Sequence, residues 1–361
     1  MEKLKVALVG TGNICHAHVG AYLRRDDVEI ISCADINLDK AKAFAAKYNI
    51  PKVFNSVEEL LAGSDPDFVD VCTWPAAHAV VSIAAANAGK HVLCEKPTCH
   101  NMEDALKLRE AVKKNGVLFQ LAVPLRYGNA AQHARKLVDD GVLGDVFYGK
   151  TAYVRQRGIP GGWFSCTKYA GGGPIIDIGV HRIDLAWFLM GCPKPISVSA
   201  TASYRIGDYR DDELKEQLAN GGATVSADNA WAGSFVPDYK FDVEDSACGF
   251  FRFENGASLF FETSWSFNGP ESFATQIAGD KAGFTLEPFK LYTADGAELK
   301  EEEITGIEET GIFYNEIDHF INCIRTGTTP SSDIEQAVQM EAMLCGIYES
   351  AKLGKEIELK Y

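Results

Sequence analysis

The pattern of apolar and polar positions changes character about one third of the way along the chain. Up to about residue 122, short apolar runs alternate with segments of helical period, and such runs are typical of parallel strands buried on both faces. The predicted strands are Lys5–Val9, Glu29–Ala34, Phe68–Thr73, His91–Glu95 and Leu118–Ala122. The predicted helices are Cys15–Arg24, Leu38–Tyr48, Val57–Leu61, Ala76–Ala88 and Asn101–Asn115. This alternation predicts an α/β fold with a doubly wound parallel sheet of Rossmann type.

The pattern beyond residue 123 predicts a second, α+β domain with a large, mostly antiparallel open sheet. The expected strands are Val146–Arg155, Ile196–Tyr204, Ser246–Glu254, Ala257–Trp265 and Phe273–Ala278. The expected helical segments are Ala130–Asp140, Gly171–Met190, Tyr314–Arg325 and Asp333–Ala351, the second of them opening on a glycine-rich loop. Asn255-Gly256 predicts a hairpin, because both residues tolerate positive φ. The stretch from Gly207 to Asp242 has no clear period and is interpreted as an irregular excursion.

Length, charge and cysteine usage narrow the class of protein. A chain of 361 residues is too long for one ordinary core and fits two domains. A formal net charge of −15 disfavours a nucleic-acid partner. No apolar run reaches the length of a membrane span, and no secretion signal fits before the first predicted strand. The ten cysteines form no Cys-x-x-Cys pair, so we interpret them as reduced thiols and expect a cytoplasmic protein without membrane partners.

The start of the chain has the features of a dinucleotide-binding loop: a strand, a tight glycine turn and a helix start. Gly10 permits the turn, and Gly12 lets the backbone approach a pyrophosphate; Cys15 holds the third motif position. Asp35 ends the second predicted strand, where an acid binds the adenosine ribose hydroxyls, and its neighbours carry no cation for a 2′-phosphate. The expected cofactor is therefore NAD. The predicted binding residues here are Gly10, Gly12, Asn13, Ile14 and Asp35.

Two further motifs carry a resemblance to a known family. Glu95-Lys96-Pro97 ends the fourth long predicted strand, and a run from Gly171 to Asp184 reads GGGPIIDIGVHRID. With these, nearly the whole chain resembles the Gfo/Idh/MocA oxidoreductases, many of which are dehydrogenases of inositols and sugars. The resemblance implies a catalytic trio of Lys96, Asp177 and His181. It also implies cofactor contacts from Thr73, Trp74, His78, Glu95 and Lys96. Cys15 and Thr73-Trp74-Pro75 depart from the usual family pattern.

The candidate catalytic residues also stand out without the resemblance. Lys96 follows a buried strand, and ligands of open α/β sheets bind at the carboxyl ends of strands. On a helix, Asp177, His181 and Asp184 would form one polar stripe of an otherwise apolar surface. The ordinary alternatives are a solvated lysine and a structural histidine with a capping aspartate. Asp184 either orients His181 or hydrogen-bonds within the helix.

Several side chains are candidates for substrate contact. Aromatic faces suit the apolar sides of sugar or cyclitol rings, and a cation can bind their oxygens. The predicted substrate-binding residues are Lys96, Arg126, Tyr153, Trp163, Asp177 and His181, with Tyr169 a further aromatic candidate. Structural roles are the alternative for each of these aromatics and for Arg126. His18 is expected to pack near the cofactor, and no cluster of residues has zinc spacing, so no metal is expected.

These observations predict an NAD(H)-dependent oxidoreductase that transfers hydride between nicotinamide and a hydroxyl or keto group of a cyclitol, sugar or sugar derivative. His181 is the expected general base, Asp177 its orienting partner, and Lys96 the donor to the reacting oxygen, with the site assembled between two domains. The alternatives are a non-catalytic NAD-binding sensor and an NAD-assisted glycosidase. We assign residues 1–122 to NAD binding and residues 123–361 to substrate binding and oligomerisation.

A homodimer or homotetramer is expected from the strands of the second domain. Apolar residues occupy both alternating and adjacent positions there, so both faces of the sheet should be apolar. The residues concerned are Phe250, Phe251, Phe253, Leu259, Phe260 and Phe261. Helices can cover one face, and a partner subunit is the expected cover for the other.

Overall fold

A computed structural model describes residues 2–206 and 240–361, so most of the expected irregular excursion, residues 207–239, lies outside the described residues. The chain forms two compact units. The first comprises Met1–Pro124 and Gly311–Glu341, and the second comprises Leu125–Thr310 and Ala342–Tyr361. The first break therefore falls two residues beyond the expected boundary at 122. The return of residues 311–341 to the first unit was not anticipated by the assignment of everything after 122 to one domain.

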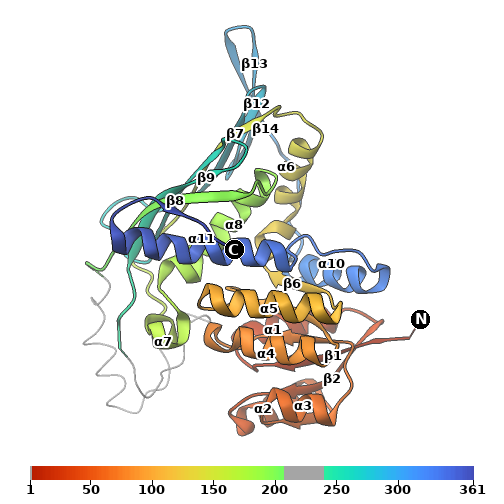
Figure 1. Ribbon diagram of the computed structural model, residues 1–361. Coiled ribbons are helices and arrows are strands. Elements are labelled where there is room, and N and C mark those ends of the chain that lie inside the picture. The colour runs from red at the N-terminus through yellow and green to blue at the C-terminus, as the bar shows by residue number, and fades with distance from the viewer. Residues whose placement is uncertain (1, 207–239) are drawn as a thin grey trace. The chain divides into compact units, whose positions relative to one another are not determined.

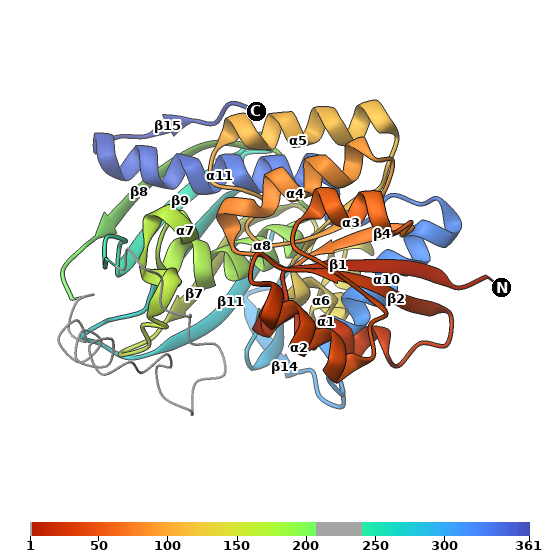
Figure 2. The ribbon, with the colours of Figure 1, turned by 90° about the horizontal axis from the view of Figure 1, so that it is seen from below.

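The described part of the first unit is built on a parallel sheet with strand order β3-β2-β1-β4-β5-β6. Its strands are β1 (Leu4–Val9), β2 (Val28–Ala34), β3 (Lys52–Phe54), β4 (Phe68–Val71), β5 (His91–Glu95) and β6 (Phe119–Ala122). Its helices are α1 (Asn13–Tyr22), α2 (Leu38–Tyr48), α3 (Val57–Gly63), α4 (Pro75–Asn87), α5 (Met102–Asn115) and α10 (Ile312–Thr326). Helices cover both faces of this sheet, with α3, α4 and α5 on one and α1 and α2 on the other (Figure 2). The predicted doubly wound Rossmann fold is confirmed.

Local sequence explains where these helices begin. Asn37, Ser56 and Asn101 each precede a helix, and their side chains accept a hydrogen bond from the backbone N–H three residues further on. In contrast, α1 begins after Gly12 and α4 begins after Trp74, and no side chain caps either of them. Among the helices that connect the strands of this sheet, the two without a side-chain cap are thus the ones that follow β1 and β4, in the middle of the sheet.

In the described residues of the second unit, the strands form one sheet of order β14-β13-β12-β11-β7-β10-β9-β8-β15. They are β7 (Val146–Val154), β8 (Pro195–Ser203), β9 (Ser246–Phe253), β10 (Ser258–Ser264), β11 (Ser272–Gly279), β12 (Ala282–Leu286), β13 (Phe289–Asp295), β14 (Glu298–Glu303) and β15 (Ile357–Glu358). Only the β7–β10 pair is parallel among these, so the mostly antiparallel sheet is confirmed. Gly256 has φ +85° in the β9–β10 turn, as the hairpin prediction requires.

Helices of this unit pack on one face of its sheet, where α8 lies across β7, β10 and β11 (Figure 1). The helices are α6 (Asn129–Asp139), α7 (Thr167–Ala170) and α8 (Val180–Leu189), and α11 (Ile334–Leu353) begins in the first unit and ends in the second. The expected helix over residues 171–190 is not continuous. A π-helical segment, Ile175–Gly179, precedes α8. No helix within the described residues combines the length and apolarity needed to cross a membrane.

Candidate functional site

The glycine loop after β1 has the geometry that a dinucleotide requires. Gly10 has φ +90°, and a Cβ there would lie 2.6 Å from the main-chain carbonyl of Cys72, so only glycine fits. A Cβ on Gly12 would meet no atom within 4 Å, which leaves open space beside the backbone at the start of α1. Asn13 is exposed and Ile14 half-buried in the first turn of that helix. Backbone N–H groups at such a helix start suit a pyrophosphate.

Asp35 is held at the end of β2 by the glycine loop itself. Its Oδ2 accepts hydrogen bonds of 2.9 Å from the backbone N–H and the hydroxyl of Thr11, and its Oδ1 accepts one from the backbone N–H of Asn37. The side chain is 12% exposed, so its orientation is fixed while lone pairs remain for a ribose diol. Lys40 Nζ lies 3.9 Å from Oδ2, a nearby cation that the sequence analysis did not consider. These residues fit NAD.

The loops after β4 and β5 are tied together by His78. This buried ring places Nδ1 2.6 Å from the carbonyl oxygen of Pro97 and Nε2 3.0 Å from that of Thr73. Thr73 and Trp74 are half-buried at the start of α4. The predicted cofactor residues Thr73, Trp74 and His78 therefore share one corner of the first unit with the Glu95–Pro97 motif.

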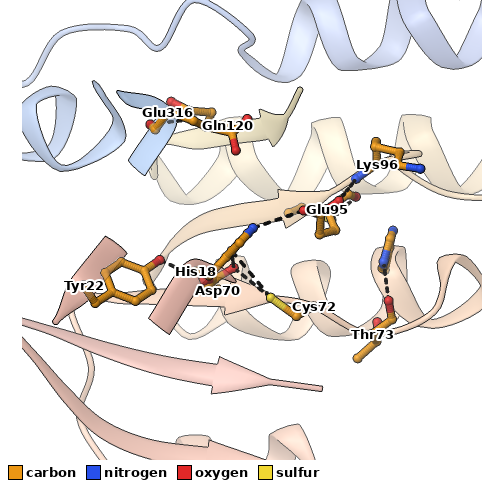
Figure 3. A network of polar contacts seen from close by, with 11 residues as sticks. His18, Tyr22, Asp70, Cys72, Thr73, Glu95, Lys96, Gln120 and Glu316 are labelled. Carbon is orange, nitrogen blue, oxygen red and sulfur yellow. Dashed lines mark hydrogen bonds and ion pairs between the residues drawn. The ribbon is translucent and has the colours of Figure 1, made fainter. Parts of the chain in front are cut away.

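Lys96 follows β5 directly and is half-buried. Its backbone N–H donates to Glu95 Oε2 at 3.1 Å, and Glu95 Oε1 lies 3.1 Å from His18 Nε2 (Figure 3). The other ring nitrogen of His18 lies 2.9 Å from Asp70 Oδ2. No partner for His18 was expected from the sequence. The signal that could have found one is Asp70, a carboxylate inside the apolar run of β4 that must have a counter-charge when buried.

Three metal-ligand side-chain types also converge here. Atoms of His18, Asp70 and Cys72 lie within 4.8 Å of one another. Hydrogen bonds account for this spacing, because Asp70 contacts both the His18 ring and the Cys72 thiol. Burial raises the pKa of Cys72 well above its usual value, which keeps the thiol protonated. We therefore treat this group as a hydrogen-bonded cluster.

In the second unit, Asp177 is oriented by Trp265. The indole Nε1 of this fully buried tryptophan donates to Asp177 Oδ2 at 3.0 Å. Trp265 belongs to an apolar cluster with Ile178, and Tyr153 packs against the same cluster. His181 is half-buried in the first turn of α8, four residues after Asp177. The sequence analysis did not identify Trp265 as a partner of Asp177.

Glu244 holds the segment that carries Asp177. Its buried carboxylate accepts hydrogen bonds from the backbone N–H groups of Gly173 and Ile175 and from the hydroxyl of Tyr348, all within 3.1 Å. A Cβ on Gly173 would overlap the backbone oxygen of Glu244, so the glycine is required by this close approach. The run GGGP is thus explained by packing against Glu244, whose role the sequence analysis did not assign.

Burial gives Arg126 and Asp184 a structural partner in each other. Arg126 and Asp184 are each 1% exposed and form a bidentate ion pair with two contacts of 2.6 Å. Both groups lie inside the core, so the ion pair accounts for Arg126 without a substrate, and its predicted substrate contact stays a prediction. Asp184 uses both carboxylate oxygens on Arg126, so it does not extend a polar stripe with Asp177 and His181. The π-helical segment also breaks the regular spacing on which that stripe depended.

The remaining aromatic candidates are half-buried. Tyr153 accepts a hydrogen bond of 2.8 Å from Arg155, and the Arg182 guanidinium lies 5.7 Å from the centre of its ring. Trp163 stacks on Phe164 with ring centroids 3.9 Å apart, and Phe164 packs against the Trp265 cluster. Tyr153 and Trp163 therefore lie around the same cluster that orients Asp177. Lys168 lies over the ring of Tyr169.

A glycine turn at a helix start, a fixed carboxylate after the second strand and a lysine at the carboxyl edge of the sheet are typical of NAD-binding oxidoreductases of the Rossmann class. Comparison with known proteins agrees. Residues 4–123 match the oxidoreductase family with an NAD-binding Rossmann fold, and residues 131–285 match the GFO/IDH/MocA C-terminal domain. The chain belongs to the Gfo/Idh/MocA oxidoreductase family, which confirms the predicted cofactor, NAD, and the predicted enzyme class.

Relatives and solved structures cover between three quarters of the chain and nearly all of it. It is 31% identical to D-glucoside 3-dehydrogenase of Escherichia coli K12, across 99% of this chain and 97% of that protein. It is 28% identical to levoglucosan dehydrogenase of Pseudarthrobacter phenanthrenivorans, across 76% of this chain and 71% of that protein. A levoglucosan dehydrogenase structure with NADH and levoglucosan shares the fold, with a TM-score of 0.81, 22% identity and coverage of 99% and 100%.

Proposed function

We propose that this protein oxidises a secondary hydroxyl group of a sugar ring, a pyranoside, with NAD as the hydride acceptor. The observation that carries the proposal is the position of Lys96. The glycine loop follows β1, Asp35 follows β2, Thr73 lies just beyond β4 and Lys96 follows β5. Carboxyl ends of parallel strands share one edge of a sheet, so the lysine lies at the edge where the cofactor residues gather.

Each candidate residue then has a defined part in the reaction. When bound, NAD accepts the hydride from the carbinol carbon. His181 removes the hydroxyl proton, which an alcohol does not lose unaided at neutral pH. Asp177, fixed by Trp265, orients the imidazole and stabilises its protonated form. The Lys96 ammonium donates a hydrogen bond to the reacting oxygen and stabilises its developing negative charge. The products are a ketone, a proton on His181 and the reduced cofactor.

The binding residues follow from the same proposal. NAD would be held by Gly10, Gly12, Asn13, Ile14, Asp35, Thr73, Trp74, His78, Glu95 and Lys96. Asp35 favours NAD over NADP, because its carboxylate repels a 2′-phosphate. Tyr153 and Trp163 would contact the apolar faces of the sugar. The names of one full-length relative, a glucoside dehydrogenase, and of the levoglucosan dehydrogenases support a pyranoside rather than a cyclitol.

A substrate screen tests this function. Purified protein with NAD+ would be offered methyl glucosides, anhydrosugars, free aldoses and inositols, and the absorbance of NADH followed. We expect turnover of at least one pyranoside, and its loss in Lys96→Ala. Reduction of NAD+ by none of these compounds, while NADH binds, would favour the non-catalytic sensor. Release of free sugar from a glycoside without net reduction of NAD+ would favour the glycosidase.

We further propose that the protein works in the cytoplasm as a homo-oligomer. All ten cysteines are free thiols, which suits a reducing compartment. On the second unit's sheet, Phe251 and Phe261 are buried, whereas Phe260 on the opposite face is 41% exposed. Phe260 contacts the rings of Tyr148 and Phe250, and these aromatics line a hollow of about 330 Å³. A second copy is the proposed cover for this face.

A further inference from the structure

A chain of buried polar contacts runs beneath the Lys96 peptide. Tyr22 donates to Asp70 at 2.8 Å, Asp70 contacts His18 Nδ1, His18 Nε2 contacts Glu95, and Glu95 accepts from the backbone N–H of Lys96 (Figure 3). His18 and Asp70 are 0% exposed and Glu95 is 5% exposed. The chain starts on α1, crosses β4 and ends at the last residue of β5.

Counting donors fixes the charge of His18. Both ring nitrogens face carboxylates, at 2.9 Å and 3.1 Å, and an ionised carboxylate only accepts hydrogen bonds. Both nitrogens must therefore carry hydrogen, so the ring is an imidazolium between two anions. Burial alone lowers the pKa of His18, but the charges and hydrogen bonds of Asp70 and Glu95 outweigh it, and the pKa lies well above 6.5.

We propose that Asp70, His18 and Glu95 form a buried positioning triad, which fixes the peptide that bears Lys96 and so directs the lysine ammonium. The triad works through Glu95. One of its oxygens is anchored by His18, which leaves the other aimed at the N–H of the next residue. The direction in which the Lys96 side chain leaves the backbone depends on that peptide. The inference rests on the proposed role of Lys96.

The other groups that face the triad do not replace its charges. Burial raises the pKa of Tyr22 and of Cys72, so both remain protonated donors to Asp70. On α10, Glu316 is 0% exposed, and burial, followed by the charge of Glu95, raises its pKa well above the usual value. Glu316 therefore stays neutral, and His18 supplies the positive charge between Asp70 and Glu95.

The test uses glutamine, whose amide oxygen and nitrogen mimic the two ring nitrogens of histidine but offer only one donor group. In His18→Gln the amide N–H₂ can donate to Asp70, but its oxygen then faces Glu95 and repels it. In the double variant with Glu95→Gln, the new amide can donate to residue 18 and still accept from the Lys96 N–H. We expect kcat to fall about tenfold or more in each single variant and to recover to within about threefold in the double variant.

A second readout follows stability rather than activity. The raised pKa of His18 adds to the stability of the wild type, and this addition is complete below about pH 6.5 and is lost as the pH rises toward the folded pKa. The loss in urea midpoint of His18→Gln, relative to wild type, should therefore be greatest near pH 5 and should shrink as the pH rises above about 6.5. His16→Gln is the matched control. It lies on the same helix, is half-buried and forms a hydrogen bond with Tyr48, so kcat should not change. Burial and then Lys47 lower the pKa of His16, so any pH trend in the midpoint of this control should have the opposite sign to that of His18→Gln.

The outcomes separate the triad from the proposed function. Normal kcat in His18→Gln together with a strong loss in Lys96→Ala overturns the triad and leaves the function standing. If adding Glu95→Gln does not restore the kcat lost in His18→Gln, the triad is also overturned. Such a loss would come from damaged packing, which a change at Glu95 does not repair. Normal turnover in Lys96→Ala defeats the proposed function. In that event the urea midpoints decide between the alternatives. If the midpoint difference between His18→Gln and wild type does not change with pH, the charged triad is rejected.

Discussion

Two carboxylates of the first unit, Asp35 and Glu95, lie where parallel strands end, and each accepts a hydrogen bond from a backbone N–H group. Asp35 accepts from Thr11 and Asn37, and Glu95 accepts from Lys96. Such contacts orient a carboxylate without consuming all of its lone pairs. Residues held in this way are ready for a ligand before it arrives, which lowers the entropy lost on binding.

Asp35 should set the choice of cofactor. Replacing Asp35 with Ser removes the charge that repels a 2′-phosphate and leaves Lys40, now 3.9 Å from Asp35, free to attract one. Adding Asn37→Arg should strengthen the effect. We expect the ratio of NADPH to NADH affinity to rise about tenfold or more, measured by fluorescence titration. Asp39→Ser, in the exposed first turn of α2, is the control. Equal affinity of the wild type for both cofactors would refute this assignment.

Glu316 should make the protein less stable as the pH rises. Its pKa in the folded state is raised, first by burial and then by Glu95. Below about pH 4.5 the carboxyl is neutral in both states, so nothing is lost there. Above that pH the Glu316 carboxyl ionises in the unfolded chain but stays neutral in the folded chain. The free energy of unfolding therefore falls until the pH passes the pKa of the folded state.

Glu316→Gln should remove this loss. The amide cannot ionise, and its N–H₂ group can donate to the oxygen of buried Gln120, whose side chain already donates to the Glu316 carbonyl. Urea midpoints of variant and wild type should be similar at pH 5 and higher for the variant at pH 8. A wild-type advantage that increases with pH would contradict the neutral state of Glu316.

Buried polar contacts that no sequence pattern predicts join secondary-structure elements of the second unit. Arg126 lies in a short 3-10 turn, Pro124–Tyr127, and Asp184 lies in α8. Their ion pair fixes α8 to that turn. Removing one partner of a buried pair leaves an uncompensated charge, which costs far more than the pair itself contributes.

Asp184→Asn should therefore destabilise the second unit strongly. We expect a loss of about 3–5 kcal/mol in the free energy of unfolding. The control is Asp318→Asn, which removes the partly exposed partner of Arg25 and should cost at most about 1 kcal/mol. Thermal or urea unfolding of both variants measures the difference. If the two variants lose the same small amount, the Arg126–Asp184 pair has no special structural role.

Periodicity predicted most of the elements that bury one or two full faces, but it missed β12 (Ala282–Leu286), whose burial alternates, as well as elements that bury little. β14 reads Glu298 to Glu303 with every residue exposed, so no alternation marks it. The Asp295-Gly296 pair before it, with Gly296 at φ +60°, was the available hairpin signal, of the same kind as Asn255-Gly256. β3 is only three residues long, and its signal was too short to detect.

Site residues were predictable where a motif places them next to an element end. Gly10, Asp35 and Lys96 fall at the ends of strands that the apolar pattern defines. Arg126 and Asp184 could not be paired from sequence, because 58 residues separate them and only the folded chain reveals their contact. The π-helical segment could not be predicted either, since it depends on Glu244, which binds Gly173 and Ile175 from a distant part of the chain.

The chain as a whole should associate through the exposed aromatic face of the second unit's sheet. Phe260→Asp places a charge among Tyr148 and Phe250 without touching the buried face. We expect light scattering to report a homodimer or homotetramer for the wild type and a smaller species for the variant at micromolar concentration. Lys194→Asp, an exposed change just before β8, is the control for general effects of a new charge. A wild type that is monomeric at this concentration would contradict the proposal.

The central claim is direct hydride transfer from a sugar carbon to NAD, with Lys96 and His181 assisting. A pyranoside found active in the screen, carrying deuterium at the oxidised carbon, would be mixed with protein and NAD+, and the reduced cofactor examined by mass spectrometry. We predict one deuterium per cofactor, formed about 10²–10⁴-fold more slowly by Lys96→Ala and His181→Ala, with NADH affinity nearly unchanged. Reduced cofactor without deuterium, or near-normal rates in both variants, would contradict the account.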